Sequence, residues 1–400
     1  MQAHSLYLHI PFCHHRCGYC DFNTYAGMEG YIPAYVLALC NELEYIARKK
    51  PHKIPLKTIF FGGGTPSLLP EEEIDRILAT IQREFETLDG TEISLEANPG
   101  QLDLEYLISI RQMGVNRISL GMQSANPDDL SLLERQHDFQ QVKKAVELIR
   151  SAGFANLNLD LIFGIPYQSL KSFQDSLDLA LTLEPEHFSL YALTIESGTP
   201  LESRLRKGMV PEPDPDLAAQ MYEIADEKFI LNGYEQYEIS NWARKDSHGL
   251  LLACRHNLQY WRNLPYLGVG AGAHGYAAGM RTENELNPKK YIQIFEQVIG
   301  NSVENQLTFP QSPVTVAVNK IDRELEMKET MMMGLRLTRE GVSSTAFKNR
   351  FGMELKDAFS TEIEELIAFG LLQWDSEPEE KLRLTEGGRL LGNLVFMRFV

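Results

Sequence analysis

The chain has 400 residues, of which 44% are hydrophobic and 23% are charged, and its formal net charge is −17. This length exceeds what one compact core normally uses, so we expect more than one domain. The acidic balance, without any block rich in Lys and Arg, argues against nucleic-acid binding. No apolar run reaches the roughly 18 residues that a membrane-spanning helix needs. The first residues also lack the pattern of a secretory signal.

Six short β-type runs recur along the first half of the chain, and amphipathic helical patterns at 32–49, 70–85 and 139–153 lie between them. This alternation predicts parallel strands joined by right-handed helical crossovers. The favoured fold is α/β, a partial six-unit (β/α) barrel, and a doubly wound open sheet is the rival. The six predicted strands are 6–10, 57–64, 92–98, 117–123, 156–164 and 187–196.

The second half of the chain reads differently. After about Tyr234 the strand and helix rhythm stops, and from Asp322 the pattern predicts helices at 324–337 and 355–370, then two short strands and a last helix. This order is typical of a winged-helix-like domain. We therefore predict a barrel domain at 1–235, a connecting region at 236–320 and a mostly helical C-terminal domain at 321–400.

Three of the five cysteines, Cys13, Cys17 and Cys20, follow the first predicted strand in the spacing C-x-x-x-C-x-x-C. The odd, uneven set of cysteines argues against disulfides and predicts a reducing compartment, the cytoplasm. Thiolates ligate iron–sulfur clusters and zinc. Three cysteines on a four-iron cluster leave one iron open to a small ligand. The alternative is a zinc knuckle completed by His14 or His15, although both lie between the cysteines.

Polar residues at the ends of successive predicted strands point to the same site. The glycines of GGGTPS end the second strand, Glu96 ends the third, Gln123 ends the fourth, and Asp160 lies in the fifth. In a barrel, the C-terminal ends of the strands converge on one mouth, where chemistry is placed. We therefore expect these residues to meet the cysteine cluster there.

The cysteine spacing, with Tyr19 before the third cysteine, resembles the signature of the radical S-adenosylmethionine (SAM) superfamily. That resemblance implies a 4Fe-4S cluster whose open iron binds SAM. The motifs YLHIPFCHHRCGYC, FFGGGTPS, ISLEANP, LLERQHD and LNLDLIFGIP are further similar to the oxygen-independent coproporphyrinogen III oxidase branch. The residues that this resemblance assigns to SAM are Tyr7, Gly63, Gly64, Thr65, Glu96, Gln123, Arg135 and Asp160.

Two features depart from the oxidases and are similar to their sister group, the heme chaperones called HemW. Phe22 stands where the oxidases carry a fourth cysteine, and only twelve residues precede Cys13. The stretch HNLQYW (256–261) resembles the HNxxYW motif of that group. The resemblance implies that His256 binds heme, and Cys254 is the runner-up ligand.

The main prediction is therefore a chaperone that binds heme and transfers it to hemoproteins on a scaffold that binds a 4Fe-4S cluster and SAM. The resemblance implies respiratory, membrane-bound recipients and a homodimer, in the cytoplasm or at the inner face of the membrane. The alternative is a coproporphyrinogen III dehydrogenase that decarboxylates its substrate by radical chemistry. Phe22, at the position of the oxidases' fourth cysteine, argues against this alternative. A third interpretation is a zinc-stabilised binding module.

Overall fold

The computed structural model describes residues 3–300, 307–377 and 379–400, and the chain forms two compact units. The first unit comprises Met1–Lys228 and Pro265–Asn319, and the second comprises Phe229–Leu264 and Lys320–Val400. Each unit is thus built from two separate stretches of the sequence.

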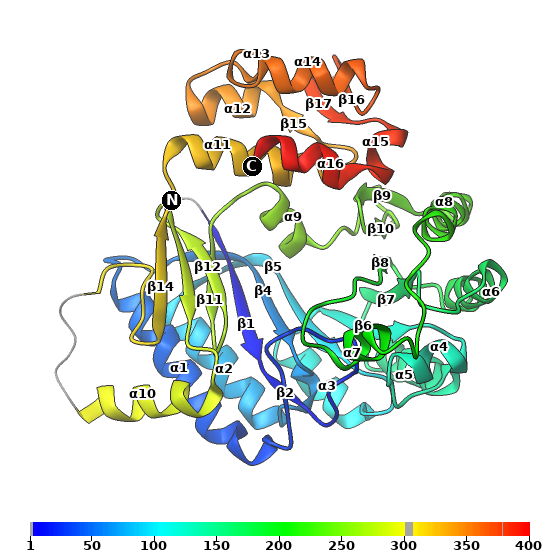
Figure 1. The fold of residues 1–400 in the computed structure, drawn as a ribbon. Helices are drawn as coiled ribbons and strands as arrows, with labels where there is room; N and C mark the ends of the chain where they lie inside the picture. The colour runs from blue at the N-terminus through cyan, green and yellow to red at the C-terminus, as the bar shows by residue number, and fades with distance from the viewer. Residues whose placement is uncertain (1–2, 301–306, 378) are drawn as a thin grey trace. The chain divides into compact units, whose positions relative to one another are not determined.

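The first unit contains the parallel sheet that the sequence predicts. Its strands neighbour one another in chain order and pair parallel throughout, which confirms the six-unit barrel (Figure 1). The strands are nearly continuous runs of buried apolar residues, as parallel strands covered on both faces must be. They are β1 (His4–Ile10), β4 (Pro55–Gly63), β5 (Glu86–Ala97), β6 (Arg117–Gln123), β7 (Leu157–Phe163) and β8 (His187–Ala192).

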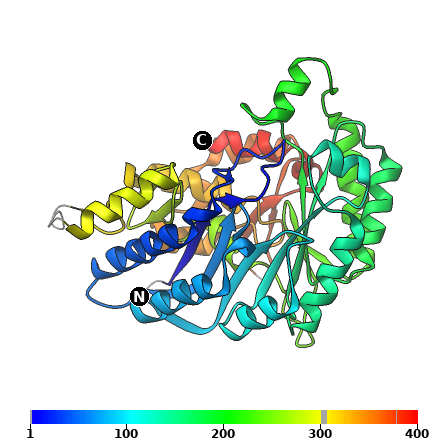
Figure 2. The same cartoon turned by 90° about the horizontal axis from the view of Figure 1, so that it is seen from below.

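Helices connect these strands and lie along the outside of the curved sheet (Figure 2). Their starts follow from local sequence: Asp138 and Gln141 form a capping box at the first turn of α5, and Ser169 caps α6 in the same way. The helices are α1 (Ile32–Arg48), α2 (Glu71–Glu84), α3 (Leu104–Gln112), α4 (Pro127–Leu132), α5 (Phe139–Ser151), α6 (Leu170–Leu181), α7 (Pro200–Arg206) and α8 (Pro215–Leu231).

The sheet continues beyond β1, where the sequence pattern predicts no strand. β11 (Tyr266–Val269) pairs parallel with β1, and the sheet then runs on through β12 (His274–Ala277), β13 (Met280–Asn284) and β14 (Thr315–Lys320). The helix α10 (Pro288–Gly300) lies between β13 and β14 in the chain. The six-unit barrel therefore carries a mainly antiparallel extension on its first edge.

A buried carboxylate fastens this extension to α1. Glu42 is 1% exposed, and each of its carboxylate oxygens accepts two hydrogen bonds. Gly270 N and the Tyr291 hydroxyl donate to Oε2 at 2.9 and 2.6 Å, and Asn284 Nδ2 and the Ser312 hydroxyl donate to Oε1 at 2.8 and 2.7 Å. A buried carboxylate is tolerated when its lone pairs are satisfied in this way.

The second unit combines helices with short strands, as the winged-helix-like prediction requires. β15, β17 and β16 form a three-stranded sheet in that order, and β9 pairs with β10 in an antiparallel hairpin. The elements are β9 (Glu235–Glu238), β10 (Asn241–Ala243), α9 (Arg255–Trp261), α11 (Arg323–Gly334), β15 (Val342–Ser343), α12 (Ser344–Phe351), α13 (Leu355–Ala358), α14 (Ser360–Ala368), β16 (Leu372–Asp375), β17 (Lys381–Leu384), α15 (Glu386–Leu390) and α16 (Gly392–Phe396).

One helix prediction in this unit is wrong. The sequence predicts a single helix over 355–370, but the structure breaks it into α13 and α14 at Phe359, whose φ and ψ are −138° and 40°. The Phe359 ring is buried against Phe347 and Phe399 at centroid distances of 6.2 and 5.4 Å. Burying this ring outweighs the local preference for a continuous helix.

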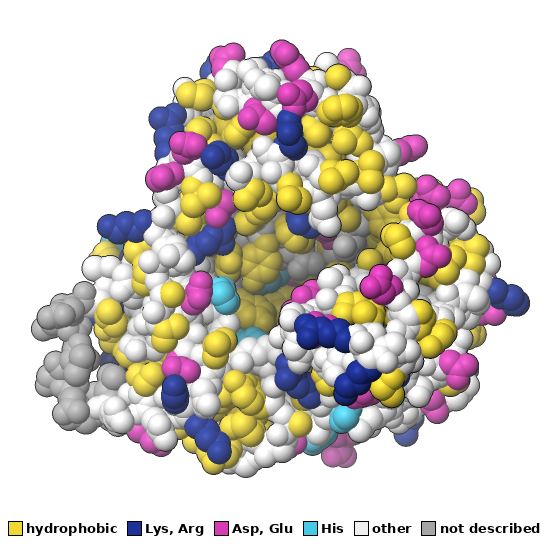
Figure 3. All heavy atoms as spheres, viewed as in Figure 1, with side chains coloured by type: hydrophobic (Ala, Val, Ile, Leu, Met, Phe, Trp, Pro, Cys, Tyr) yellow, Lys and Arg dark blue, Asp and Glu magenta, His cyan; other side chains and the backbone are white. Residues whose placement is uncertain are grey.

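Charged side chains of both signs are interspersed over the face of the molecule that Figure 3 draws. Many form ion pairs along helices, such as Arg48 with Glu44 at 2.8 Å and Lys171 with Asp175 at 2.8 Å. Across the described residues, no helix combines the length and the apolar character that crossing a membrane demands.

Candidate functional site

The cysteine segment forms a loop that is closed at its base. The short strands β2 (Phe12–Cys13) and β3 (Tyr25–Ala26) pair parallel, so both ends of the loop are held together. Gly64 N and Thr65 N donate to the carbonyls of Ile10 and Phe12 at 2.9 and 2.8 Å, which fastens the loop to the end of β4. The cysteines are thereby fixed at the C-terminal end of the sheet, as predicted for a barrel enzyme.

The three cysteines line one cavity of about 400 Å³. Burial raises the pKa of Cys13 to about 11, although the Thr65 hydroxyl donates to its sulfur at 3.6 Å. Arg135 Nη1 donates to Cys17 Sγ at 3.5 Å. Among the described residues, no three His, Cys, Asp or Glu side chains are grouped so as to hold a single metal ion. The ligands of a four-iron cluster instead bind separate irons, and cysteines spread around a cavity suit that arrangement.

Seven of the eight residues that the resemblance assigns to SAM line this same cavity, although they come from five separate segments of the chain. The eighth, Tyr7, does not line it: its hydroxyl bonds to His9 Nδ1 at 3.0 Å and its ring stacks on Phe60. The lining members of the predicted set are Gly63, Gly64, Thr65, Glu96, Gln123, Arg135 and Asp160.

Two carboxylates are buried in the wall of the cavity. Burial, and then the nearby charge of Asp160, raises the pKa of Glu96 to about 8, although Gly63 N donates to Glu96 Oε2 at 3.0 Å. Burial also raises the pKa of Asp160, whose oxygens accept from Asn158 at 2.7 Å and Ser119 at 3.1 Å. A cationic group entering the cavity favours the charged form of Glu96, so the site is suited to an ammonium.

Two glycines keep the cavity open. A Cβ atom on Gly64 would lie 3.0 Å from Cys13 Sγ and 2.6 Å from the carbonyl oxygen of Phe12. A Cβ atom on Gly121 would lie 2.9 Å from Gln123 Nε2 and 3.0 Å from Arg135 Nη2. At Gly64 only bare backbone fits, whereas a side chain at Gly121 would displace the ends of Gln123 and Arg135. The donor set and the open backbone therefore fit a cluster with a small zwitterionic ligand.

The sequence analysis missed Asn98 as a member of the site. Its Nδ2 donates to the Thr65 hydroxyl at 2.9 Å, and its Oδ1 accepts from Arg135 Nη2 at 2.6 Å. Asn98 thus links the two side chains that donate to Cys13 and Cys17. Its position at the end of EISLEAN, two residues after Glu96, was the available signal.

The histidine predicted to bind heme lies in the second unit, on α9. His256 is 1% exposed, and its Nε2 is 2.8 Å from the Tyr260 hydroxyl, with the two rings edge to face. Cys254, the runner-up, is fully buried. Ligation of heme iron through His256 Nε2 therefore requires its hydrogen bond with Tyr260 to open. The assignment of His256 stays a prediction.

Residues 7–180 match the Radical SAM superfamily, and residues 321–391 match the HemN C-terminal domain. The chain is 38% identical over 397 residues to the heme chaperone HemW of Bacillus subtilis, with 99% of both chains covered. It is 34% identical over 406 residues to the heme chaperone HemW of Escherichia coli, covering 99% of this chain and 98% of that one.

Among solved structures, coproporphyrinogen III oxidase (HemN) from Escherichia coli, described as a radical SAM enzyme, superposes with a TM-score of 0.81. The match covers 100% of this chain and 90% of that chain at 23% identity. At 23% identity, this structural similarity concerns the fold alone, and it confirms the predicted architecture.

Proposed function

The chain belongs to the heme chaperone HemW family within the radical SAM superfamily, and on this premise we propose that it binds heme and transfers it to hemoproteins. The observation that carries the proposal is the 38% identity to a heme chaperone over 99% of both chains. Similarity of this extent leaves no part of the chain without a counterpart in that relative.

We further propose that Cys13, Cys17 and Cys20 hold a 4Fe-4S cluster. Bound there, the cluster would have one iron without a protein ligand, which would be open to SAM, and it would supply the electron for reductive cleavage of SAM. The closed base of the cysteine loop and the shared cavity of the three thiols support this assignment. Each thiol gives up its proton on ligation.

The surrounding side chains then have distinct roles in holding SAM. Glu96 accepts from the ammonium, Gly63 and Gly64 let the ligand approach the backbone, and Arg135 supplies positive charge beside Cys17. The guanidinium of Arg135 is kept in place by three acceptors, Cys17 Sγ, Asn98 Oδ1 and the Gly121 carbonyl at 3.5, 2.6 and 2.9 Å. The other assigned residues, Tyr7, Thr65, Gln123 and Asp160, complete the proposed set. For Tyr7 the role is indirect, through its hydrogen bond to His9.

For the cargo, we propose His256 as the heme ligand; it belongs to the stretch Phe229–Leu264 of the second unit. We also propose that the recipients are hemoproteins of the respiratory membrane and that the chain forms a homodimer. Its proposed location is the cytoplasm, with peripheral contact at the inner face of the membrane. Nucleic acid is not among the proposed partners.

The test is transfer of heme. The chain is loaded with hemin and mixed with the apo form of a respiratory b-type cytochrome in vesicles, and transfer is followed by the Soret absorption of each partner. Apomyoglobin, which takes up free heme, is the control acceptor. We expect transfer to the cytochrome at a rate above that of hemin alone. Failure of the wild-type chain to bind hemin would refute the proposal.

A second candidate function is oxidative decarboxylation of coproporphyrinogen III, which the nearly complete SAM site favours. It is tested anaerobically on cluster-reconstituted protein with SAM, dithionite and coproporphyrinogen III, by measuring 5′-deoxyadenosine and vinyl porphyrin together. We expect no vinyl product. Formation of both products, with one 5′-deoxyadenosine for each vinyl group, would overturn the chaperone proposal in favour of the dehydrogenase.

A further inference from the structure

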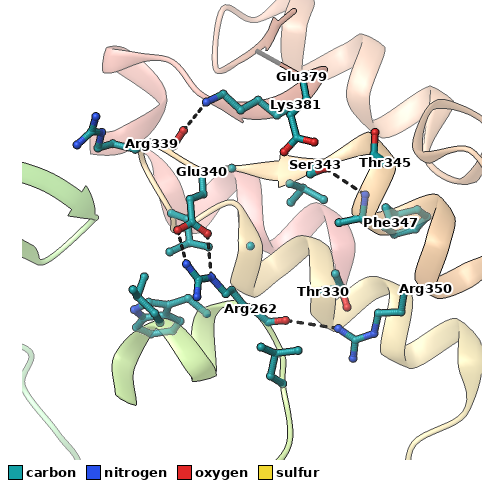
Figure 4. Close-up of a pocket in the computed structure, with 18 of the residues that line it drawn as sticks. Arg262, Thr330, Arg339, Glu340, Ser343, Thr345, Phe347, Arg350, Glu379 and Lys381 are labelled. Carbon is teal, nitrogen blue, oxygen red and sulfur yellow. Dashed lines mark hydrogen bonds and ion pairs between the residues drawn. The ribbon is translucent and has the colours of Figure 1, made fainter. Parts of the chain in front are cut away.

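The second unit contains a cavity of about 990 Å³, more than twice the volume of the cavity at the cysteines. All of its lining residues belong to this unit, and most come from α9, α11, the segment that leads into β15, α12 and β17 (Figure 4). The others include Tyr237 of β9 and two residues of the stretch 251–253. The proposed roles of the cluster and SAM make no use of this space.

One wall of the cavity is apolar and aromatic. Leu258 and Trp261, three positions apart on α9, lie on this wall together with Leu337 and Phe347. The spacing places both α9 residues on one face of the helix, whereas His256 does not line the cavity. The wall therefore offers a hydrophobic surface for a flat ligand.

Trp261 also carries an unused donor. Its indole Nε1 is buried without a hydrogen-bond partner, although a buried indole N–H normally finds one. The guanidinium of Arg336 lies 5.2 Å from the centroid of the Trp261 ring. An acceptor group on a bound ligand would satisfy this donor.

The remaining walls carry charged side chains, most of them in ion pairs. Arg262 is paired with Glu340, with Nε donating at 2.9 Å (Figure 4). Arg350 is paired with Glu326, and Arg339 with Glu235, and neither of these carboxylates lines the cavity. Among the interactions of the described residues, Lys381 has no carboxylate partner: its Nζ donates to the backbone carbonyl of Arg339 at 2.8 Å. The charged lining residues are Arg262, Arg339, Arg350, Lys381, Glu340 and Glu379.

We propose that this cavity holds the porphyrin, with the macrocycle against Trp261 and its neighbours and a carboxylate of the ligand on Lys381. The inference deepens the proposed function and rests on it, because a planar apolar ring that bears two propionates is the ligand chemistry that heme presents. Lys381, whose ammonium donates to a backbone carbonyl in the described part of the chain, is the basic group that can pair with a propionate. Recognition of the ring and its carboxylates is thereby separate from ligation of the iron.

The test uses metal-free protoporphyrin IX beside hemin, because the metal-free ring needs no axial ligand. Binding is measured by quenching of tryptophan fluorescence and, for hemin, by the Soret band. Ala346→Trp fills the cavity from α12, where Ala346 lines it. Ala368→Trp, at an exposed position of α14 away from the cavity, is the matched control.

We expect Ala346→Trp and Lys381→Ala each to weaken binding of both ligands about tenfold, the latter through loss of one charge-assisted hydrogen bond. The dimethyl ester of protoporphyrin should bind wild type and Lys381→Ala alike. His256→Ala should retain protoporphyrin. Circular dichroism and melting curves check that each variant is folded.

The outcomes separate the two proposals. Unchanged binding of both ligands by folded Ala346→Trp and Lys381→Ala would place the porphyrin elsewhere and overturn this inference, while heme transfer by wild type would still stand. Absence of hemin binding in the wild-type chain would overturn the proposed function itself. If His256→Ala lost protoporphyrin binding while Ala346→Trp and Lys381→Ala kept it, the cavity would not be the site that recognises the porphyrin ring.

Discussion

Replacing Gly64 by alanine tests the geometry of the cysteine site directly. The new Cβ would lie 2.6 Å from the carbonyl oxygen of Phe12, 2.9 Å from that of Ile10 and 3.0 Å from Cys13 Sγ, whereas ordinary contacts begin near 3.4 Å. Both carbonyls are held by hydrogen bonds from Thr65 N and Gly64 N. The backbone therefore has little freedom to yield, and the loop that carries Cys13 must shift.

Overpacking of this kind costs about 1–3 kcal/mol, and contact with two fixed carbonyls places Gly64→Ala at the upper end. A penalty of about 3 kcal/mol on the closed loop corresponds to a reduction of about a hundredfold in its population. We expect the variant to carry less iron and sulfide per chain after anaerobic reconstitution, and to melt at a lower temperature than wild type.

Gly30→Ala is the matched control, because no atom lies within 4 Å of the Cβ that it would add. This control should match wild type in iron content and in melting temperature. If Gly64→Ala also carried the wild-type amount of iron and melted at the wild-type temperature, the close packing between β4 and the cysteine loop would be refuted.

Three further predictions follow from buried charged groups. In Glu42→Gln the NH2 group of the new amide must face an N–H of Gly270 or Asn284, so two buried donors meet without an acceptor. Calorimetry should therefore show a loss of about 3 kcal/mol in the free energy of unfolding. Burial raises the pKa of Glu238 from 4.5 to about 7, so its contribution to stability is full below pH 4.5 and is lost as pH rises through 7. Between pH 5 and 8 the melting temperature should fall less in Glu238→Gln than in wild type, and Glu96 contributes to the fall in both. An equal fall in the two proteins would contradict the raised pKa of Glu238. In Arg135→Lys, a single ammonium replaces a guanidinium that donates to three acceptors, so equilibrium dialysis should show an affinity for SAM about tenfold weaker than in wild type. Unchanged affinity would contradict a role for the guanidinium in holding SAM.

The barrel and its mouth could be predicted from sequence because two strong physical signals coincide there. Buried parallel strands are continuous apolar runs, and the polar residues that end them, such as Glu96 and Gln123, must converge at one edge. The cysteine spacing then identified the kind of site. Asn98 was missed because a single asparagine after a strand is equally typical of an ordinary turn.

The sheet extension and the orientation of single side chains were not predictable in the same way. The strands β11 and β12 have four residues each and follow glycines and aromatics without a clear period, so their pairing depends on tertiary partners such as β1. Tyr7 sits in a recognised motif, yet its side chain contacts His9 and Phe60 and does not line the cavity. The direction of one side chain depends on packing that a motif does not encode.

The division of each unit between two stretches of the chain has a consequence for biosynthesis. During translation, residues 229–264, which include α9, leave the ribosome well before their packing partners at 320–400. Because domains fold as units, this segment waits for the last part of the chain before it can join a core. We therefore expect nascent chains that stop before residue 320 to lack a folded second unit. The cavity beside Trp261 would then form only after residues 320–400 have been synthesised, so shorter nascent chains would not capture heme there.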